Sequence, residues 1–268
     1  MGDGNGKYVP GPGAGDAGEP ILRLVGVEKA LEGRKVLDGI TLDIPRNRIT
    51  AIIGLSGAGK SVLLKHMIGL MKPDRGQVTV DGADINLLSK KELREVRQRF
   101  GMLFQSGALF DSLTVFENVA VPLREKTGLD EEAIREKVVR MLRIVGLENA
   151  QEKYPDELSG GMVRRVALAR AVVMSPEIIL FDEPTTGLDP IIRSSILNLI
   201  WKTHEKYQFT MVMVSHDIPE IFRYCQHVVV VHDGRIVEVG TPEQIQKSIN
   251  PFVHQLVEGD VTGPLPVV

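Results

Sequence analysis

The sequence contains 268 residues, of which 43% are hydrophobic and 25% are charged, and its formal net charge is −3. These values are ordinary for a globular protein with one large or two small domains. Because no block of like charges occurs, the sequence disfavours nucleic-acid binding by a whole basic face, and we expect no nucleic-acid partner. The single cysteine, Cys225, is expected to be a buried structural thiol in a reducing compartment. No signal peptide and no run of about 18 or more apolar residues is present, which predicts a soluble cytosolic chain.

The chain begins with a tail followed by short strands. Residues 1–20 are rich in glycine and proline and carry few apolar side chains, so we expect them to be disordered. Runs of β-forming residues at 21–27, 36–44 and 77–80 predict a small, partly antiparallel sheet. Another apolar run, at 49–53, leads directly into a glycine-rich segment.

This glycine-rich segment matches the pattern G-x-x-x-x-G-K-[ST] in full. In such a turn, successive backbone N–H groups face a phosphate, and the helix that begins there adds its positive dipole end. We expect Lys60 to reach the β- and γ-phosphates and the Ser61 hydroxyl to bind Mg²⁺. A plain glycine turn would not need the lysine and the hydroxyl, so the segment predicts a site for a nucleoside triphosphate. The expected contacts are Gly54, Ser56, Gly57, Ala58, Gly59, Lys60 and Ser61.

Helices and buried strands follow in the rest of the chain. A capping box at 89–92, a capping Asp130 and a helical pattern at about 160–173 predict a helix-rich stretch over about 93–173. Apolar strands are then expected at 178–181, 211–214 and 228–231, with helices at 192–202 and after the capping Asp217. Apolar strands that alternate with helices indicate an α/β fold with a parallel sheet covered on both faces. The helical stretch is therefore predicted to be an insertion.

Two carboxylates, Asp182 and Glu183, end the run 178–181. In a parallel sheet the ligand crevice lies beyond the carboxyl ends of the strands, where the phosphate loop also begins. We expect Asp182 to help hold Mg²⁺ and Glu183 to polarise a water for attack on the γ-phosphate. Acids at strand ends are common, but beside a complete phosphate loop these two predict catalysis.

Four further segments complete a pattern that resembles the nucleotide-binding subunits of ATP-binding cassette (ABC) transporters. They are Leu103-Phe104-Gln105-Ser106, Leu158-Ser159-Gly160-Gly161-Met162, Gly187-Leu188-Asp189 and Val214-Ser215-His216-Asp217. The resemblance runs from about residue 21 to residue 245. It implies a phosphate-loop NTPase core with a parallel sheet, a small antiparallel β subdomain and an inserted helical subdomain. It also implies the hydrolysis of ATP to ADP and phosphate, with ATP and Mg²⁺ bound.

The resemblance further implies roles for single residues. Gln105 would contact Mg²⁺ and the attacking water, Glu183 would be the general base, and His216 would contact the γ-phosphate. Asp189 would couple two active sites. The signature segment, Ser159, Gly160 and Gly161, would bind the γ-phosphate of ATP held by a second subunit. The implied catalytic residues are Glu183, His216, Gln105 and Lys60, and the implied metal ligands are Ser61, Gln105 and Asp182.

The chemistry of the signature segment supports its role across a dimer interface. Ser159 can cap a helix whose first turn is glycine-rich, which makes a second anion-binding helix end. Because the phosphate loop already cradles one nucleotide, a second anion site is best explained by two copies that sandwich two ATP molecules. We therefore expect a homodimer.

Other segments are similar to one branch of the family, the ATPases of Mla/Mce-type lipid transporters. These segments are 104–119, 122–125 and Met162, where most members of the family have glutamine. The resemblance implies an MlaE-type membrane permease, a periplasmic Mce-domain protein and, in some systems, a small STAS-domain subunit. It places the chain at the cytoplasmic face of a bacterial inner membrane and implies phospholipid transport. An ATPase for a small solute such as an amino acid shares every catalytic motif, and a non-transport cassette ATPase is a weaker alternative.

Two regions depart from the family pattern or lie beyond it. The family places an aromatic residue on adenine after the first strand, but residues 27–34 contain none, which leaves Leu31 and Arg34 as alternatives. The extension 246–268 begins with a helix start at Asn250-Pro251 and ends in an apolar, proline-containing tail. We expect this tail to dock, either on its own domain or on the second ATPase copy.

Overall fold

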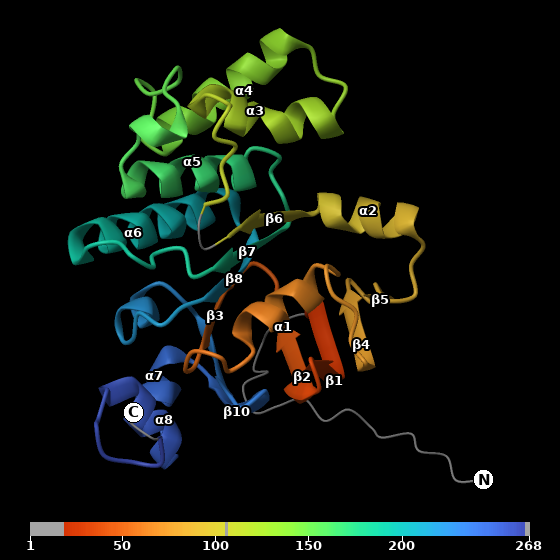
Figure 1. Cartoon of the computed structure of the whole chain (residues 1–268), viewed down its shortest axis with the longest axis vertical. Coiled ribbons are helices and arrows are strands. Elements are labelled where there is room, and N and C mark those ends of the chain that lie inside the picture. The colour runs from red at the N-terminus through yellow and green to blue at the C-terminus, as the bar shows by residue number, and fades with distance from the viewer. Residues whose placement is uncertain (1–18, 105–106, 266–268) are drawn as a thin grey trace.

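The computed structural model describes residues 19–104 and 107–265. Within these ranges, the main sheet contains six strands in the order β10-β9-β3-β8-β7-β6 (Figure 1). All neighbouring pairs are parallel except β10 and β9. The strands β3 and β8 are buried along their whole length, as expected for a sheet covered on both faces. The strands are β3 (Ile49–Ile53), β6 (Phe100–Leu103), β7 (Ile178–Asp182), β8 (Thr210–Val214), β9 (His227–His232) and β10 (Arg235–Gly240).

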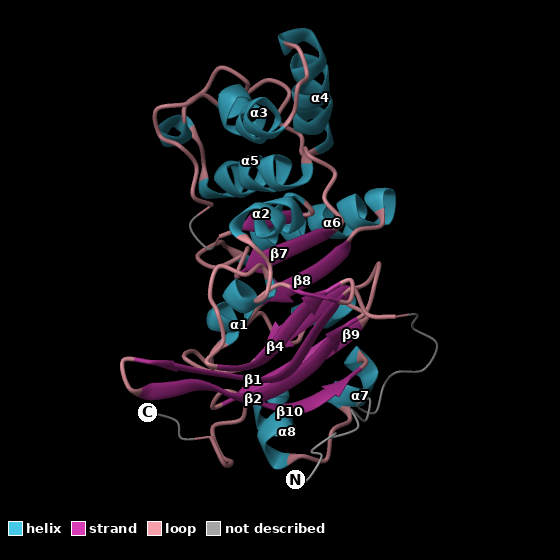
Figure 2. Ribbon diagram, turned by 90° about the vertical axis from the view of Figure 1, so that its right-hand side faces the viewer, coloured by secondary structure: helices cyan, strands magenta, loops and turns pink. Residues whose placement is uncertain are grey.

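A second, antiparallel sheet lies beside the first, in the order β2-β1-β4-β5. A two-residue turn joins β1 to β2, and both of its residues, Glu32 and Gly33, have positive φ, as a type I′ hairpin turn requires. Figure 2 shows this long hairpin extending to the left in the lower part of the molecule. The strands are β1 (Leu22–Leu31), β2 (Arg34–Ile44), β4 (Arg75–Val80) and β5 (Ala83–Asp84).

Helices occupy both sides of the main sheet. Figures 1 and 2 show α3, α4 and α5 grouped in a separate layer at one end of the molecule, whereas α1 lies between the two sheets. No helix in the described ranges is both long and apolar enough to cross a bilayer. The helices are α1 (Lys60–Met67), α2 (Lys90–Gln98), α3 (Val115–Lys126), α4 (Glu131–Ile144), α5 (Gly160–Val172), α6 (Pro190–Tyr207), α7 (Pro242–Gln246) and α8 (Pro251–Glu258), with 3-10 turns at Pro155–Glu157 and Glu220–Arg223.

Alternate residues of the main strands enter two different cores. Ile53 packs in the core formed with α3 to α8, whereas its neighbour Ile52 packs with α1 and the small sheet. This division follows from the two-residue period of a strand, which points successive side chains to opposite faces. One rigid sheet therefore connects the helical layer on one face to the phosphate loop and the small sheet on the other.

The predicted architecture is confirmed, with local differences. The capping boxes and caps at Ser89 and Asp130 are present, and the thiol of Cys225 is buried, which raises its pKa to about 12. The strand β10 was not predicted, because its residues are only half-buried and do not form a continuous apolar run. The strand β6 lies within the predicted helical insertion but pairs with β7 in the main sheet.

The prediction of a helix after Asp217 is wrong. Only the short 3-10 turn Glu220–Arg223 follows, and its first residue is preceded by Pro219 rather than by a capping side chain. The carboxylate of Asp217 is engaged elsewhere, as described below, so it is not available to cap a helix.

The C-terminal extension packs on its own domain as far as the structure describes it. Asn250 caps α8, and the ring of Phe252 lies 4.2 Å, centroid to centroid, from the ring of His232 at the end of β9. Gln255 is buried, and its side-chain oxygen accepts a hydrogen bond from the backbone N–H of Leu265 at 2.7 Å. Leu265 is buried in the main core. Residues 266–268 and almost all of the predicted disordered tail, 1–20, lie outside the described residues.

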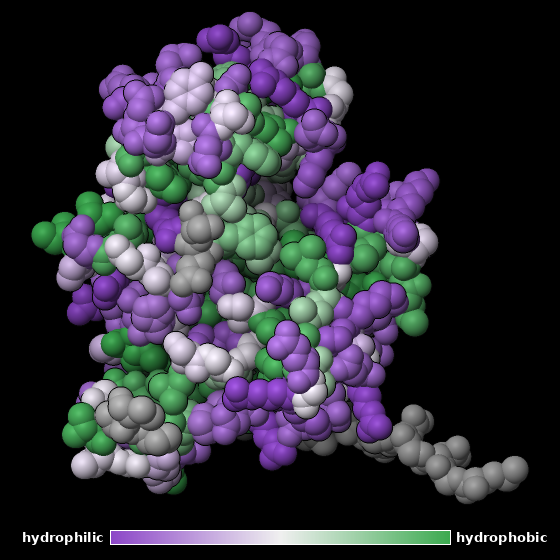
Figure 3. Space-filling model, viewed as in Figure 1, coloured by the Kyte–Doolittle hydropathy of each residue, from purple (hydrophilic) through white to green (hydrophobic). Residues whose placement is uncertain are grey.

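On the outer surface, polar and apolar residues are distributed unevenly. Figure 3 shows that the end of the molecule formed by the helical layer is mostly hydrophilic, whereas hydrophobic residues gather lower on the same face, where this layer meets the rest of the molecule. Phe104 and Phe110, which follow β6, are among the large hydrophobic residues with exposed side chains.

Candidate functional site

The phosphate loop connects β3 to α1, and its shape depends on glycine. A Cβ atom at Gly54 would lie 2.1 Å from the carbonyl oxygen of Val231, and a Cβ atom at Gly59 would lie 2.7 Å from that of Val36. Both glycines also have positive φ values, 152° and 95°, which side chains disfavour. Only glycine lets the loop pack this closely between β9 and β2.

Lys60 begins α1 with its ammonium group turned back on the loop. Its Nζ atom donates hydrogen bonds to the carbonyl oxygens of Gly54 and Leu55, both at 2.8 Å. Burial lowers the pKa of Lys60, and the nearby carboxylates of Glu183 and Asp182 act in the opposite direction. Phosphate oxygens entering the loop could replace these two carbonyl acceptors, because an ammonium group bonds more strongly to charged oxygens.

Ser61 and Asp182 meet although 121 positions separate them in the sequence. The Ser61 hydroxyl donates to Asp182 Oδ1 at 2.8 Å, which joins the start of α1 to the end of β7. Burial raises the pKa of Asp182, whereas the hydrogen bond from Ser61 lowers it. A hydroxyl and a carboxylate are the oxygen ligands that Mg²⁺ prefers, and two protein ligands leave positions for water and phosphate oxygens. These residues therefore fit Mg²⁺, although the described ranges contain no cluster of three His, Cys, Asp or Glu residues suited to a metal ion.

Glu183 and His216 face each other across the ends of β7 and β8. His216 Nδ1 lies 3.6 Å from Glu183 Oε2, and the hydroxyl of Thr186 donates to the same oxygen at 3.0 Å. The His216 side chain is 51% exposed, so its ring borders open space next to a partly buried carboxylate. The predicted convergence of Asp182 and Glu183 on the phosphate loop is therefore present in the geometry, and His216 lies beside Glu183.

A supporting network behind these residues was not predicted. The carboxylate of Asp217 accepts a hydrogen bond from Thr185 and lies 3.2 Å from the guanidinium of Arg193 on α6. Asp217 follows His216, and Thr185 lies two residues after Glu183, so the network ties the loops after β7 and β8 together. One signal was visible in the sequence, an acid directly after His216, but it could equally be taken for a helix cap.

The signature segment is placed apart from the phosphate loop. Ser159 caps α5 by accepting a hydrogen bond from Met162 N at 3.3 Å, and a Cβ atom at Gly161 would lie 2.7 Å from Ile192 on α6. Figures 1 and 2 show α5 in the helical layer and α1 near the small sheet. Gly160 lies beside Leu188, so the segment packs against the start of α6.

Two other predicted site residues need separate mention. Asp189 caps α6, with its Oδ1 atom accepting hydrogen bonds from Ile191 N and Ile192 N, both at 3.1 Å. Its predicted role in coupling two active sites stays a prediction. Gln105 lies outside the described residues.

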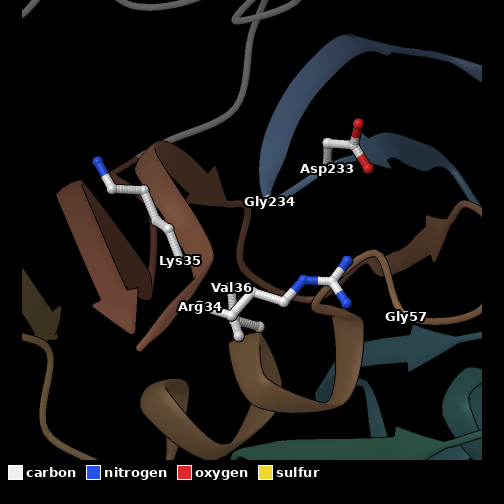
Figure 4. Close-up of a pocket in the computed structure, with 6 residues that line it drawn as sticks. All are labelled: Arg34, Lys35, Val36, Gly57, Asp233 and Gly234. Atoms are coloured by element: carbon white, nitrogen blue, oxygen red, sulfur yellow. The ribbon is translucent and has the colours of Figure 1, made fainter. Parts of the chain in front are cut away.

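A cavity of about 280 Å³ opens beside Gly57 of the phosphate loop. Figure 4 shows that the Arg34 side chain extends toward Gly57, whereas Lys35 points away and Asp233 lies on a separate turn. Leu31, the other alternative for a base contact, is not one of the residues that line this cavity. The lining residues are Arg34, Lys35, Val36, Gly57, Asp233 and Gly234.

Comparisons with known proteins agree with this geometry. Residues 37–186 match the family model described as ABC transporter. The chain is 45% identical to the intermembrane phospholipid transport system ATP-binding protein MlaF of Haemophilus influenzae, over 87% of this chain and 88% of that protein. It is 39% identical to the probable ribonucleotide transport ATP-binding protein mkl of Mycobacterium leprae, over 94% and 73% of the two chains. A dimeric post-hydrolysis structure of the ATP-binding cassette MJ0796, bound to ADP and phosphate, superimposes with a TM-score of 0.75 at 32% identity, over 82% of this chain and 98% of that one.

Proposed function

Because the chain belongs to the ABC transporter family, we propose that it is the ATP-binding and ATP-hydrolysing subunit of a transporter that moves phospholipids between the inner and outer membranes of a bacterium. The observation that supports phospholipid as the cargo is the 45% identity, over nearly nine tenths of both chains, to a protein named for intermembrane phospholipid transport. The observation that supports hydrolysis is the meeting of Ser61, Asp182, Glu183 and His216 at one edge of the sheet.

The chain's own residues bind and orient the triphosphate. Backbone N–H groups of the phosphate loop and the start of α1 hold the phosphates, and Lys60 exchanges its carbonyl acceptors for phosphate oxygens. Ser61 and Asp182 would hold Mg²⁺, which neutralises phosphate charge when bound. No covalent intermediate is needed, since positioned charges and an oriented water suffice for phosphoryl transfer.

Glu183 is the general base of this proposal. Its carboxylate accepts a proton from the water that attacks the γ-phosphate, while Thr186 and His216 keep the carboxylate in place. His216 is exposed enough to contact the γ-phosphate directly. Gln105 is assigned to the metal and the attacking water by the family resemblance.

The second anion site, at the start of α5, supports a homodimer. In this arrangement, Ser159, Gly160 and Gly161 of one copy contact the γ-phosphate bound by the other copy, and Asp189 lies at the interface between the two sites. The MJ0796 cassette, which resembles this chain in structure, is dimeric. A two-fold axis between the copies makes the two sites equivalent, because each copy contributes its phosphate loop to one site and its signature segment to the other.

The remaining partners follow from the proposed transporter. We assign a membrane permease of the MlaE type, a periplasmic Mce-domain protein and, in some systems, a STAS-domain subunit. The exposed rings of Phe104 and Phe110, which flank Gln105 in the sequence, support a contact between this region and the permease. The chain would then be a peripheral subunit at the cytoplasmic face of the inner membrane.

A small solute is the competing cargo. The mycobacterial relative is named for ribonucleotide transport, so a ribonucleotide is the specific small solute to consider. The catalytic residues are the same in both cases, so they do not distinguish the two cargos. The higher identity to the phospholipid-transport protein favours phospholipid.

Reconstitution of the assembled transporter tests the proposal. The chain is purified with its membrane subunits, inserted into proteoliposomes, and supplied with ATP and a fluorescent phospholipid. We expect ATP-dependent movement of the phospholipid, which Lys60→Ala abolishes and the charge-matched control Lys90→Ala, on the exposed start of α2, preserves. Uptake of a ribonucleotide or amino acid by the same vesicles, without phospholipid movement, would contradict the proposed cargo.

A further inference from the structure

The cavity beside Gly57 has walls that are held firmly in place. The backbone N–H of Asp38 donates to the carbonyl oxygen of Gly234 at 2.9 Å, which joins β2 to the turn between β9 and β10. A Cβ atom at Gly234 would lie 2.5 Å from the carbonyl oxygen of Val36, so the two segments are in direct backbone contact. A ligand that enters this cavity therefore meets a preformed surface.

Arg34 is directed into this cavity by the hairpin that precedes it. The turn at Glu32 and Gly33 pairs Leu31 with Arg34 and sets the register of β2. Arg34 and Val36 are two positions apart and therefore share one side of the strand, and both line the cavity. Lys35 points the other way, as Figure 4 shows.

The charges near the cavity leave Arg34 available for a ligand. The ammonium of Lys35 lies 2.7 Å from Asp38 Oδ1, and this hydrogen bond raises the pKa of Lys35. Arg235 also pairs with Asp38. The guanidinium of Arg34 has no hydrogen-bond or ion-pair partner among the residues that the structure describes.

The position of the cavity identifies the part of the ligand that it receives. The phosphates are held by the loop that begins α1, so the nucleoside must leave the loop on one of its open sides. A volume of about 280 Å³ is close to the lower limit of small-molecule sites, about 300–1,000 Å³, and suits part of a nucleotide rather than all of it. No aromatic side chain lines this cavity.

On the basis of the proposed ATPase function, we infer that the planar guanidinium of Arg34 is the platform on which the nucleotide base stacks. A guanidinium is flat, delocalised and weakly hydrated, so it can lie on the face of a base much as an aromatic ring does. Val36 supplies apolar contact from the same side of β2. Arg34 is thus a binding contact for the nucleoside end, separate from the groups that hold the phosphates.

Three substitutions at Arg34 distinguish a stacking platform from a simple positive charge. The dissociation constant of ATP is measured by calorimetry on the full chain, and Arg34→Ala is expected to weaken binding about tenfold. Arg34→Tyr restores a flat surface and is expected to recover most of the affinity, whereas Arg34→Lys restores only charge and is expected to remain weak. Binding of inorganic tripolyphosphate, which has no base, should be the same in all four proteins.

The outcomes separate this inference from the proposed function. Recovery by Arg34→Lys but not by Arg34→Tyr, or an equal loss of ATP and tripolyphosphate binding, would show that Arg34 contacts phosphate and would overturn the inference. Unchanged ATP affinity in Arg34→Ala would overturn it as well. The control Arg94→Ala removes the same charge from the exposed face of α2 and should bind ATP like the original chain. Failure of the original chain to bind ATP would instead contradict the proposed function.

Discussion

Glu183 leaves β7 in the left-handed region of backbone space, with a φ of 50°. A residue with a side chain adopts this conformation at a cost of about 1–3 kcal/mol, and such costs are concentrated at functional sites. The backbone N–H of Glu183 donates to Val214 O at 3.1 Å, which fixes the turn to the end of β8. The turn directs the carboxylate toward Thr186 and His216 instead of along the strand.

This geometry leads to a prediction for Glu183→Gln. The amide keeps the size of the side chain but cannot accept a proton from water, so we expect ATP to bind with unchanged affinity and hydrolysis to fall about a hundredfold or more. Phosphate release and nucleotide binding are measured on the same preparation. The control Glu132→Gln, on the exposed start of α4, should hydrolyse ATP normally. Hydrolysis by Glu183→Gln at close to the original rate would remove Glu183 from the proposed mechanism.

At the scale of elements, the sequence was most informative where a strand ended in a chemically specific group. The phosphate loop after β3 and the acids after β7 could be predicted to converge, because parallel strands bring their carboxyl ends to one edge. The bond between Ser61 and Asp182 is the direct result. Short polar residues in loops gave less information, since Asp217 could cap a helix or bond across to Thr185, and only the folded chain decides between them.

The docked tail could be predicted only in outline. An apolar end that follows a helix was expected to pack on something, but its partner depended on contacts between residues that neither periodicity nor composition specifies. The structure supplies one such contact, the side chain of Gln255, which bonds to both the N–H and the C=O of Leu265. Gln255 therefore acts as a side-chain clamp on an otherwise irregular segment.

We predict that Gln255→Leu releases this segment. The substitution leaves the buried N–H of Leu265 without its acceptor, which costs about 1–3 kcal/mol, or roughly 5- to 150-fold in local opening. Hydrogen exchange followed by mass spectrometry should show faster exchange over residues 259–265, while β3 and β8 remain protected. The control Gln246→Leu changes an exposed glutamine at the end of α7 and should leave the tail unchanged. Equal exchange in the two variants would mean that the apolar contact of Leu265 holds the tail without the clamp.

At the scale of the whole molecule, one chain carries two glycine-rich helix starts with different surroundings. The start of α1 lies beside Asp182 and near Glu183, whereas the start of α5 packs against α6 in the helical layer. The helical layer packs on one face of the main sheet and α1 packs on the other, so the two helix starts are apart within one copy. A complete site with both helix starts on one nucleotide therefore requires a second copy, as in the proposed homodimer.

Mixing two inactive variants tests this arrangement directly. Lys60→Ala damages the phosphate loop, and Ser159→Arg blocks the start of α5, so each variant alone should hydrolyse ATP poorly. In a mixed dimer, the loop of the Ser159→Arg copy faces the intact signature segment of the Lys60→Ala copy, which rebuilds one complete site out of two. If the sites act independently and copies pair at random, an equal mixture should recover about a quarter of the original activity. Ser159→Arg should still bind ATP, which confirms that it is folded. If each site lay within a single copy, every site in the mixture would retain one damaged part, and mixing would restore nothing.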